Sequence, residues 1–202
     1  MKNILKIAQE LAPHCGIAPA TALVASTEQT DIDMLRCIVE AGKELQSRFD
    51  WPQLKKPYTI TGAGNVTHNL PADYSRMVRG FSVTVAGSCV RGSLSDEEFN
   101  RLAPVLGTPR FFRTTPTTIE FWPYINTPTT AQIIYITENW LSGDKYDPTA
   151  DDDAPLIDDN VVSKGALWRW KRMKGQDFTD YLAEYEADLK RYSDFARSER
   201  QP

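Results

Sequence analysis

The fold of this chain is decided by residues 160–196, which read NVVSKGALWRWKRMKGQDFTDYLAEYEADLKRYSDFA. Apolar side chains recur every three or four residues through two runs, the spacing of helices with one buried face. Gly175 lies between the runs, where the left-handed residue after a helix is usually glycine, and Asp177 can cap the second run. The stretch therefore predicts two consecutive helices, each with an apolar stripe to bury.

The opposite end of the chain predicts partners for these stripes. Residues 30–49, TDIDMLRCIVEAGKELQSRF, have helical spacing, with Thr30 as the expected N-cap and Trp51-Pro52 closing the helix. The expected stripe is Ile32, Leu35, Val39, Gly42, Leu45 and Phe49. A short helix over residues 3–11 precedes it, ended by Pro13. Helices at both chain ends must bury their stripes, and each other is the simplest partner.

The middle of the chain has a different character. Thr, Val, Ile and aromatic residues dominate residues 58–137, and Gly and Pro punctuate them, which favours strands. We expect strands at residues 58–61, 66–70, 81–86, 111–114, 118–122 and 132–137. Ser95 and Glu98 form a capping-box pattern that predicts one short helix among them.

These elements predict an α+β fold: a helical bundle formed by the N- and C-terminal helices, with an inserted, mainly antiparallel β domain. The expected domains are residues 1–55 plus 160–202 for the bundle, 56–140 for the β-rich insert, and 141–159 for an acidic linker. The linker region, 141–160, holds seven aspartates against one lysine, so we interpret it as a solvated, self-repelling tether. Its aspartates lack the spacing of a calcium-binding loop.

Composition excludes several classes of protein. Of 202 residues, 41% are hydrophobic and 25% charged, which is ordinary for a globular chain, and a net charge of −4 disfavours a strongly basic nucleic-acid binder. Three Cys and two His lie at scattered positions, so we expect no disulfide framework, metal or cofactor. No nucleotide-binding loop or nucleophile elbow is present, so we expect no enzyme. No apolar run is long enough to span a bilayer, and we expect synthesis in a reducing cytosol.

A basic segment, residues 164–174, has three interpretations. It carries Lys164, Arg169, Lys171, Arg172 and Lys174 with two tryptophans and no acid. Cations and aromatics could bind nucleic acid, or could simply belong to a helix with a basic exposed face and tryptophans packed inward. A protein-docking surface is the third interpretation, and we favour it because Trp and Arg are enriched in interfaces.

Five segments then resemble a known family. They are the Trp-ended helix at residues 38–51, LPADYSRMV at 70–78, GTPRFF at 107–112 running on to IEFWP at 119–123, IIYIT at 133–137, and the terminal phrase from ALW at 166–168 through KGQD at 174–177 to Tyr185. In this order they resemble the head-to-tail adaptor (connector) proteins of tailed bacteriophages, especially short-tailed ones. The resemblance covers about residues 31–192, and the first 30 residues match nothing we can name.

The resemblance implies a structural virion protein at the head–tail junction, made in the host bacterial cytoplasm. Such adaptors form a homo-oligomeric ring, usually a dodecamer, beneath the portal protein. The ring extends the DNA channel and receives the tail nozzle or tail tube protein, and the β part is a candidate contact for tail fibres. DNA would pass through without specific binding, and no membrane is involved.

The resemblance also guides the expected sites. The C-terminal helix commonly engages the portal in such rings. The candidate interface residues are Lys164, Arg169, Lys171, Arg172, Lys174, Tyr185, Tyr192 and Arg197. We further expect Asp151, Asp152 and Asp153 to face the channel, where they would repel passing DNA.

A different class of function stays open. Trp122, Tyr124 and Trp140 could form a stacking platform, as in a carbohydrate- or host-receptor-binding module of a phage tail. An exposed row of these aromatics on the β domain would favour that alternative, and their burial would disfavour it.

Overall fold

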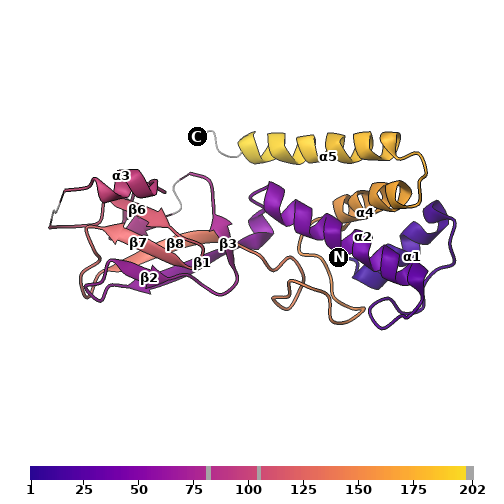
Figure 1. Ribbon diagram of the computed structural model, residues 1–202, viewed down its shortest axis with the longest axis horizontal. Coiled ribbons are helices and arrows are strands. Elements are labelled where there is room, and N and C mark those ends of the chain that lie inside the picture. Colours follow the sequence, from indigo (N-terminus) through magenta and orange to yellow (C-terminus); the bar gives the residue numbers. More distant parts are fainter. Residues whose placement is uncertain (81–82, 104–105, 199–202) are drawn as a thin grey trace. The chain divides into compact units, whose positions relative to one another are not determined.

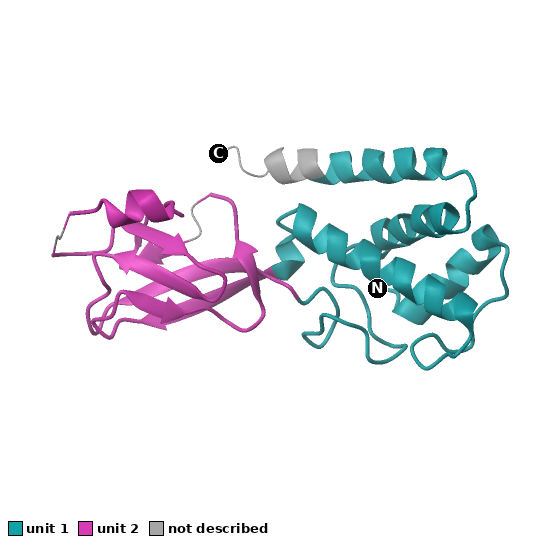
Figure 2. Cartoon of the chain, in the orientation of Figure 1, with its two compact units in different colours: residues 1–54, 139–202 teal, residues 55–138 magenta. Residues whose placement is uncertain are grey.

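The chain contains five α-helices and two antiparallel sheets over the residues described by the computed structural model, which are 1–80, 83–103 and 106–198, with side chains to residue 192 (Figure 1). It divides into two compact units, residues 1–54 with 139–202 and residues 55–138 (Figure 2). Unit 1 holds four of the five helices and unit 2 holds every named strand and the remaining helix. The predicted α+β class is confirmed.

The helices of unit 1 come from both ends of the sequence. They are α1 (Ile4–Cys15), α2 (Gln29–Arg48), α4 (Asp159–Met173) and α5 (Thr179–Ser198), with the short 3-10 helix η1 at Pro52–Leu54. α4 contacts each of the other three, and α1 also contacts α2. Ile4, Ile38, Leu45, Val162, Ala166 and Tyr185 are each 0% exposed at these contacts. Burial of apolar surface, at about 25 cal/mol per Å², is the main force that joins the two chain ends.

Small residues bring α2 close to its neighbours. A Cβ atom added to Gly42 would lie 2.3 Å from the Trp140 ring, and one added to Gly165 of α4 would lie 3.0 Å from the Cβ of Ala41. The buried face of α2 accordingly runs through Met34, Cys37, Ile38, Ala41, Gly42, Leu45 and Gln46. The predicted stripe was therefore wrong at Ile32, which is 42% exposed. Helical spacing favoured the large Ile32 side chain for the buried face, whereas the close contacts of α2 with its neighbours bury small residues such as Ala41 and Gly42.

The helix boundaries differ from the predictions near the N-terminus. α1 continues past Pro13 to Cys15, and Gly16 ends it with a φ of 68°. The prediction that Pro13 ends α1 was wrong, because Ala12 and Cys15 are buried and hold the last turn in place. The expected Thr30 cap was also wrong, since α2 begins at Gln29. At the other end, Gly175 has the expected positive φ of 66°, and Asp177 accepts a hydrogen bond from the Thr179 amide at 3.0 Å.

Unit 2 is built around one central strand. β8 (Thr130–Thr137) pairs on one side with β1 (Lys55–Thr61), and it also pairs with β3 (Tyr74–Met77) and β4 (Val83–Val85). β5 (Ser88–Cys89) pairs with β4. The second sheet has the order β2-β7-β6, made of β2 (Thr67–Asn69), β7 (Thr118–Trp122) and β6 (Phe111–Thr114). One apolar core, including Val83, Phe112, Phe121 and Ile133, draws on both sheets.

Local signals located most of these elements. β6 and β7 have the predicted bounds, and the Thr115 amide donates to the Thr118 carbonyl at 2.8 Å in the turn between them. α3 (Asp96–Asn100) carries the predicted capping box between Ser95 and Glu98, with both of its hydrogen bonds present. β3 and β5 were not predicted. The expected strand at 81–86 is observed as β4, and its first two positions lie outside the described residues.

The LPADY phrase has a structural role in unit 2. The Asp73 carboxylate accepts hydrogen bonds from the Tyr135 hydroxyl at 2.8 Å, the Thr137 hydroxyl at 2.9 Å and the Lys56 ammonium at 2.8 Å. It thereby connects the turn before β3 to both β8 and β1. Burial alone would raise the pKa of Asp73, but these three donors together lower it.

Candidate protein interface

α4 carries the basic segment as far as Met173. The two tryptophans of this segment differ in their burial. Asp158 caps the helix by accepting from the Asn160 amide at 2.8 Å. Trp170 points inward and is 1% exposed, whereas Trp168 is half-buried and packs against Tyr185 and Phe178 of the α5 region. The indoles therefore belong to the packing of unit 1, as the plain-helix interpretation predicted.

Three of the five basic side chains are already paired within the chain. The Lys164 ammonium lies 2.6 Å from both Glu184 and Asp188 of α5, which raise its pKa. The Arg169 guanidinium pairs with Glu44 of α2 and stacks 4.3 Å from the Trp168 ring. The Lys174 ammonium lies 2.6 Å from Asp33 and 4.7 Å from the Trp170 ring. These cations join helices of one chain, which the sequence could not show.

The remaining two basic residues, Lys171 and Arg172, form no ion pair with a described side chain. The Lys171 ammonium lies 5.7 Å from the centre of the Tyr181 ring. Arg172 is exposed and has no hydrogen-bond or ion-pair partner among the side chains described up to residue 192. Of the five basic residues of segment 164–174, Lys171 and Arg172 are therefore the two that a partner could bind without first breaking an ion pair with a described side chain.

The aromatic candidates of α5 hold that helix to unit 1. Tyr185 is 0% exposed, and burial raises the pKa of its hydroxyl while the charges of Arg169 and Arg48 oppose the rise. The Tyr192 hydroxyl donates to the Asp158 carboxylate, and its ring lies 5.3 Å from that of Trp51. Burial first, and then Asp158, raise the pKa of Tyr192 to about 12. Arg197 lies outside the residues whose side chains are described.

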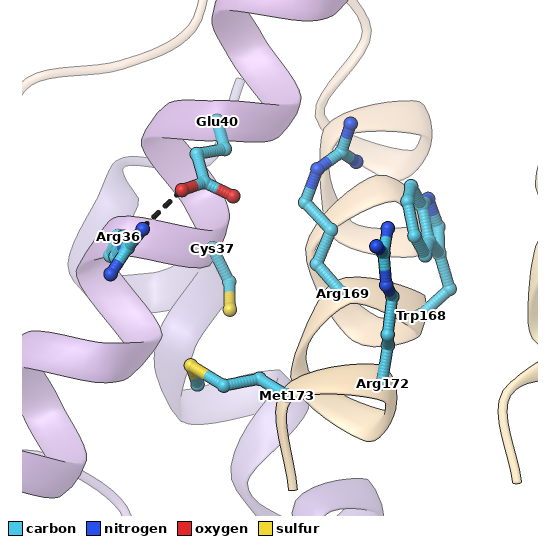
Figure 3. A pocket seen from close by; sticks show the side chains of 7 residues that line it. All are labelled: Arg36, Cys37, Glu40, Trp168, Arg169, Arg172 and Met173. Carbon is cyan, nitrogen blue, oxygen red and sulfur yellow. Dashed lines mark hydrogen bonds and ion pairs between the residues drawn. The ribbon is translucent and has the colours of Figure 1, made fainter. Parts of the chain in front are cut away.

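A hollow of about 360 Å³ opens between α2 and α4, and we call it the α2–α4 hollow. Figure 3 shows Arg36, Cys37 and Glu40 of α2 on one side and four residues of α4 on the other. Arg36 is bound to Glu40 at 2.9 Å, and the sulfur atoms of Cys37 and Met173 point toward each other in the hollow. Met173 is 40% exposed. Arginine, tryptophan and methionine around a concave surface are typical of protein interfaces.

The acidic segment is folded onto unit 1 by two of its aspartates. The Asp151 carboxylate accepts from the amides of Leu23 at 3.0 Å and Val24 at 2.7 Å. Asp153 is 4% exposed, pairs with Lys145 and accepts from the Thr149 amide at 2.7 Å and the Ala150 amide at 3.1 Å. The interpretation as a solvated tether is therefore wrong at these residues, because their carboxylates satisfy backbone amides. Asp152 alone of the three is exposed, and the channel-facing role of Asp151, Asp152 and Asp153 stays a prediction.

The aromatic platform of the alternative function is not formed. Trp140 is 0% exposed and belongs to unit 1, where its indole donates to the Tyr146 carbonyl at 2.7 Å. Trp122 and Tyr124 are half-buried in unit 2, and the Trp122 indole donates to the Ala103 carbonyl at 3.0 Å. The three rings therefore do not make one exposed row.

Two surveys of the described residues complete the inventory of sites. Among the described side chains, those of residues 1–80, 83–103 and 106–192, no three His, Cys, Asp or Glu are grouped so as to hold a metal ion. Over residues 1–80, 83–103 and 106–198, none of the helices has the length and hydropathy that a bilayer span requires.

Burial raises the pKa of Cys15 to about 11 and that of Cys37 to about 12, so both stay protonated at neutral pH.

Comparison with known proteins assigns this α+β chain to a class of phage assembly proteins. The family model described as SU10 adaptor protein matches residues 6–202, and the chain belongs to that family. The match spans both units and includes residues 6–30, where the sequence alone gave no resemblance. No curated protein matches the sequence. The expected relation to phage adaptor proteins is confirmed.

Proposed function

We propose that this chain is a subunit of a head-to-tail adaptor ring, a structural protein of the virion that joins the portal to the tail and extends the DNA channel. The observation that carries the proposal is the family match over residues 6–202, which includes all elements of both units except the first two residues of α1. In this role the chain acts by binding its neighbours and catalyses no reaction. Its partners are further copies of itself, the portal protein and the tail nozzle or tail tube protein, with tail fibres as a further candidate.

The surface of unit 1 supports this role. A ring requires two unlike faces on each subunit, related by a rotation that closes. The α2–α4 hollow offers cations at one place, and the acidic segment offers carboxylates at another. Most charged side chains in both regions pair with an opposite charge or a backbone amide within the chain. The charged side chains without such a partner are therefore available to bind a neighbouring copy or the portal.

Native mass spectrometry of the chain mixed with the portal of the same phage tests the proposal. We expect a complex in which one portal ring carries a fixed, multiple number of copies of the chain. A chain that stays monomeric and never binds the portal would contradict the adaptor role.

The same assay tests the predicted interface. Replacing Lys171 and Arg172 together by Glu should abolish the complex while the far-ultraviolet circular dichroism spectrum stays unchanged, because neither residue forms an ion pair with a side chain described up to residue 192. Unimpaired assembly of this variant would remove Lys171 and Arg172 from the interface. Lys55→Glu, at an exposed position of unit 2, is the matched control.

A further inference from the structure

Among the residues with described side chains, the ion pairs of unit 1 leave out Asp152 of the acidic segment and Lys171 and Arg172 of the basic segment. In the acidic segment the other six aspartates have partners: Asp144, Asp147, Asp151, Asp153, Asp158 and Asp159. Asp152 has none among the described residues and is exposed. In the basic segment, Arg172 is the corresponding residue, since Lys171 faces the Tyr181 ring.

The backbone presents Asp152 at the tip of a fixed turn. The Asp153 amide donates to the Ala150 carbonyl at 3.2 Å and closes a four-residue turn with Asp152 at its third position. The carboxylates on either side are both engaged, since Asp151 accepts from the Val24 amide and Asp153 pairs with Lys145 of its own segment, so the turn is held in place before any partner binds. Such preorganisation reduces the entropy that binding would otherwise cost.

Arg172 lies on a concave surface. It lines the α2–α4 hollow, where Figure 3 shows its side chain next to the Trp168 ring on α4. A projecting turn with the small residue Ala150 on one side and Ala154 on the other could enter a concave surface of this kind. The other guanidinium groups in the hollow, Arg36 and Arg169, already have carboxylate partners, so an incoming carboxylate would bind Arg172.

The two residues cannot meet within one chain. The amides of Ile4 and Leu5, at the start of α1, donate to the carbonyls of Asp153 and Asp151. At the far end of α1, Cys15 interacts electrostatically with Lys171, the neighbour of Arg172. The 12 residues of α1 separate these ends by about 18 Å at about 1.5 Å per residue. A pair between Asp152 and Arg172 is therefore a head-to-tail contact between copies, the kind that generates rings.

We propose that the Asp152 turn of one copy enters the α2–α4 hollow of the next copy and pairs with Arg172. The inference rests on the proposed ring and names one of its subunit contacts. It also replaces the channel-facing prediction for Asp152, because a carboxylate in this contact is covered by the neighbouring copy.

A charge-swap experiment in assembled particles tests the pair. A phage lacking this gene is complemented with variants of the chain, and the copies per purified particle are measured. Arg172→Glu alone and Asp152→Arg alone should each reduce incorporation at least about tenfold, since each places like charges together. The variant with both changes should restore it to within about twofold. Lys55→Glu, an exposed position of unit 2, should match the unchanged chain.

Failure of the swap is distinguishable from failure of the adaptor role. If each single variant is incorporated normally, or if the double variant fails like the singles, the contact is wrong although the ring stands. If the unchanged chain is absent from the particles, both the ring and this contact are wrong.

Cross-linking decides the case in which a charge reversal impairs folding. In a background of Cys37→Ala, which removes the thiol that lines the hollow, and Cys89→Ser, which removes the exposed thiol, Asp152→Cys combined with Arg172→Cys should give a ladder of linked copies when the particles are treated with a short bismaleimide cross-linker. Each single cysteine variant should remain monomeric. A dimer from either single variant, or no ladder from the pair, would overturn the proposed contact.

Discussion

Asp153 is one of two aspartates that bind the acidic segment to the rest of unit 1. Its side chain is 5% exposed, and it receives the Lys145 ammonium and the amides of Thr149 and Ala150. These donors lie on the same segment, while the Asp153 carbonyl accepts from the Ile4 amide at 2.9 Å. A single residue therefore shapes the segment and attaches it to α1.

Asp153→Ala should destabilise unit 1 by about 2–4 kcal/mol, because it leaves two amides and one ammonium without their acceptor. Asp152→Ala removes an exposed neighbour and should change the free energy of unfolding by less than about 0.5 kcal/mol. Urea denaturation followed by tryptophan fluorescence measures both, since Trp51, Trp140, Trp168 and Trp170 lie in unit 1. Equal effects of the two variants would contradict the assigned role of Asp153.

The same carboxylate predicts a dependence of stability on pH. Burial alone would raise the pKa of Asp153, but Lys145 and the two amides outweigh burial and lower it below 3.8. A lowered pKa in the folded state stabilises the fold above the unfolded pKa, and this stabilisation is lost as the pH falls through the folded pKa. The urea concentration at the unfolding midpoint should therefore fall as the pH is lowered below about 4. This fall should be less steep in Asp153→Ala than in the unchanged chain. A variant with the same acid dependence would exclude Asp153 as the source.

At the scale of elements, Gly42 shows how packing reverses a helix propensity. Replacing glycine by alanine inside a helix usually stabilises it by about 1 kcal/mol. Here the new Cβ would lie 2.3 Å from the Trp140 ring, so Gly42→Ala should instead destabilise unit 1 by about 1–3 kcal/mol. The cost should be smaller in a Trp140→Phe background, which removes the ring atoms that clash. A double-mutant cycle of thermal unfolding measures this coupling, and additive effects would contradict the close approach.

Local chemistry determined how much of the fold could be predicted. The Ser95 capping box, the Gly175 helix end and the bounds of β6 and β7 depend on residues a few positions apart, and all were predicted. β3 was missed because its residues, YSRM, do not alternate, and it forms by pairing with the distant β8. α1 continues past Pro13 because the burial of Ala12 and Cys15 outweighs the helix-breaking effect of proline.

The sequence predicted which charged residues make up the candidate site, but not which residues they pair with. Sequence identified the basic segment, yet the partners of Lys164, Arg169 and Lys174 lie on α5 and α2, up to 141 positions away. Likewise, Asp151 caps amides 127 and 128 positions earlier, so the acidic segment could only be interpreted as a tether. Charge counting therefore overestimated the free charge on both segments.

At the scale of the whole molecule, unit 2 is an insertion whose two ends leave the sheet together. Lys55, at the start of β1, is paired with Ile136 near the end of β8. The core of unit 2 consists of residues between Ile60 and Ile133, all within the insertion. Such an insert can hold its own core without residues from the helical unit.

A fragment of residues 55–138 should therefore fold alone. We expect a cooperative thermal transition and dispersed amide resonances in its nuclear magnetic resonance spectrum. Val83→Asp, which would place a charge in the core, is the matched negative control and should abolish both. A fragment that is unfolded without this change would show that unit 2 depends on unit 1.

Electron cryomicroscopy of the intact virion tests the adaptor role most directly. The account predicts a ring of identical copies between the portal and the tail, with density that fits unit 1 and unit 2 each as a separate body around a central DNA channel. A virion whose head–tail junction contains no ring of this chain would contradict it.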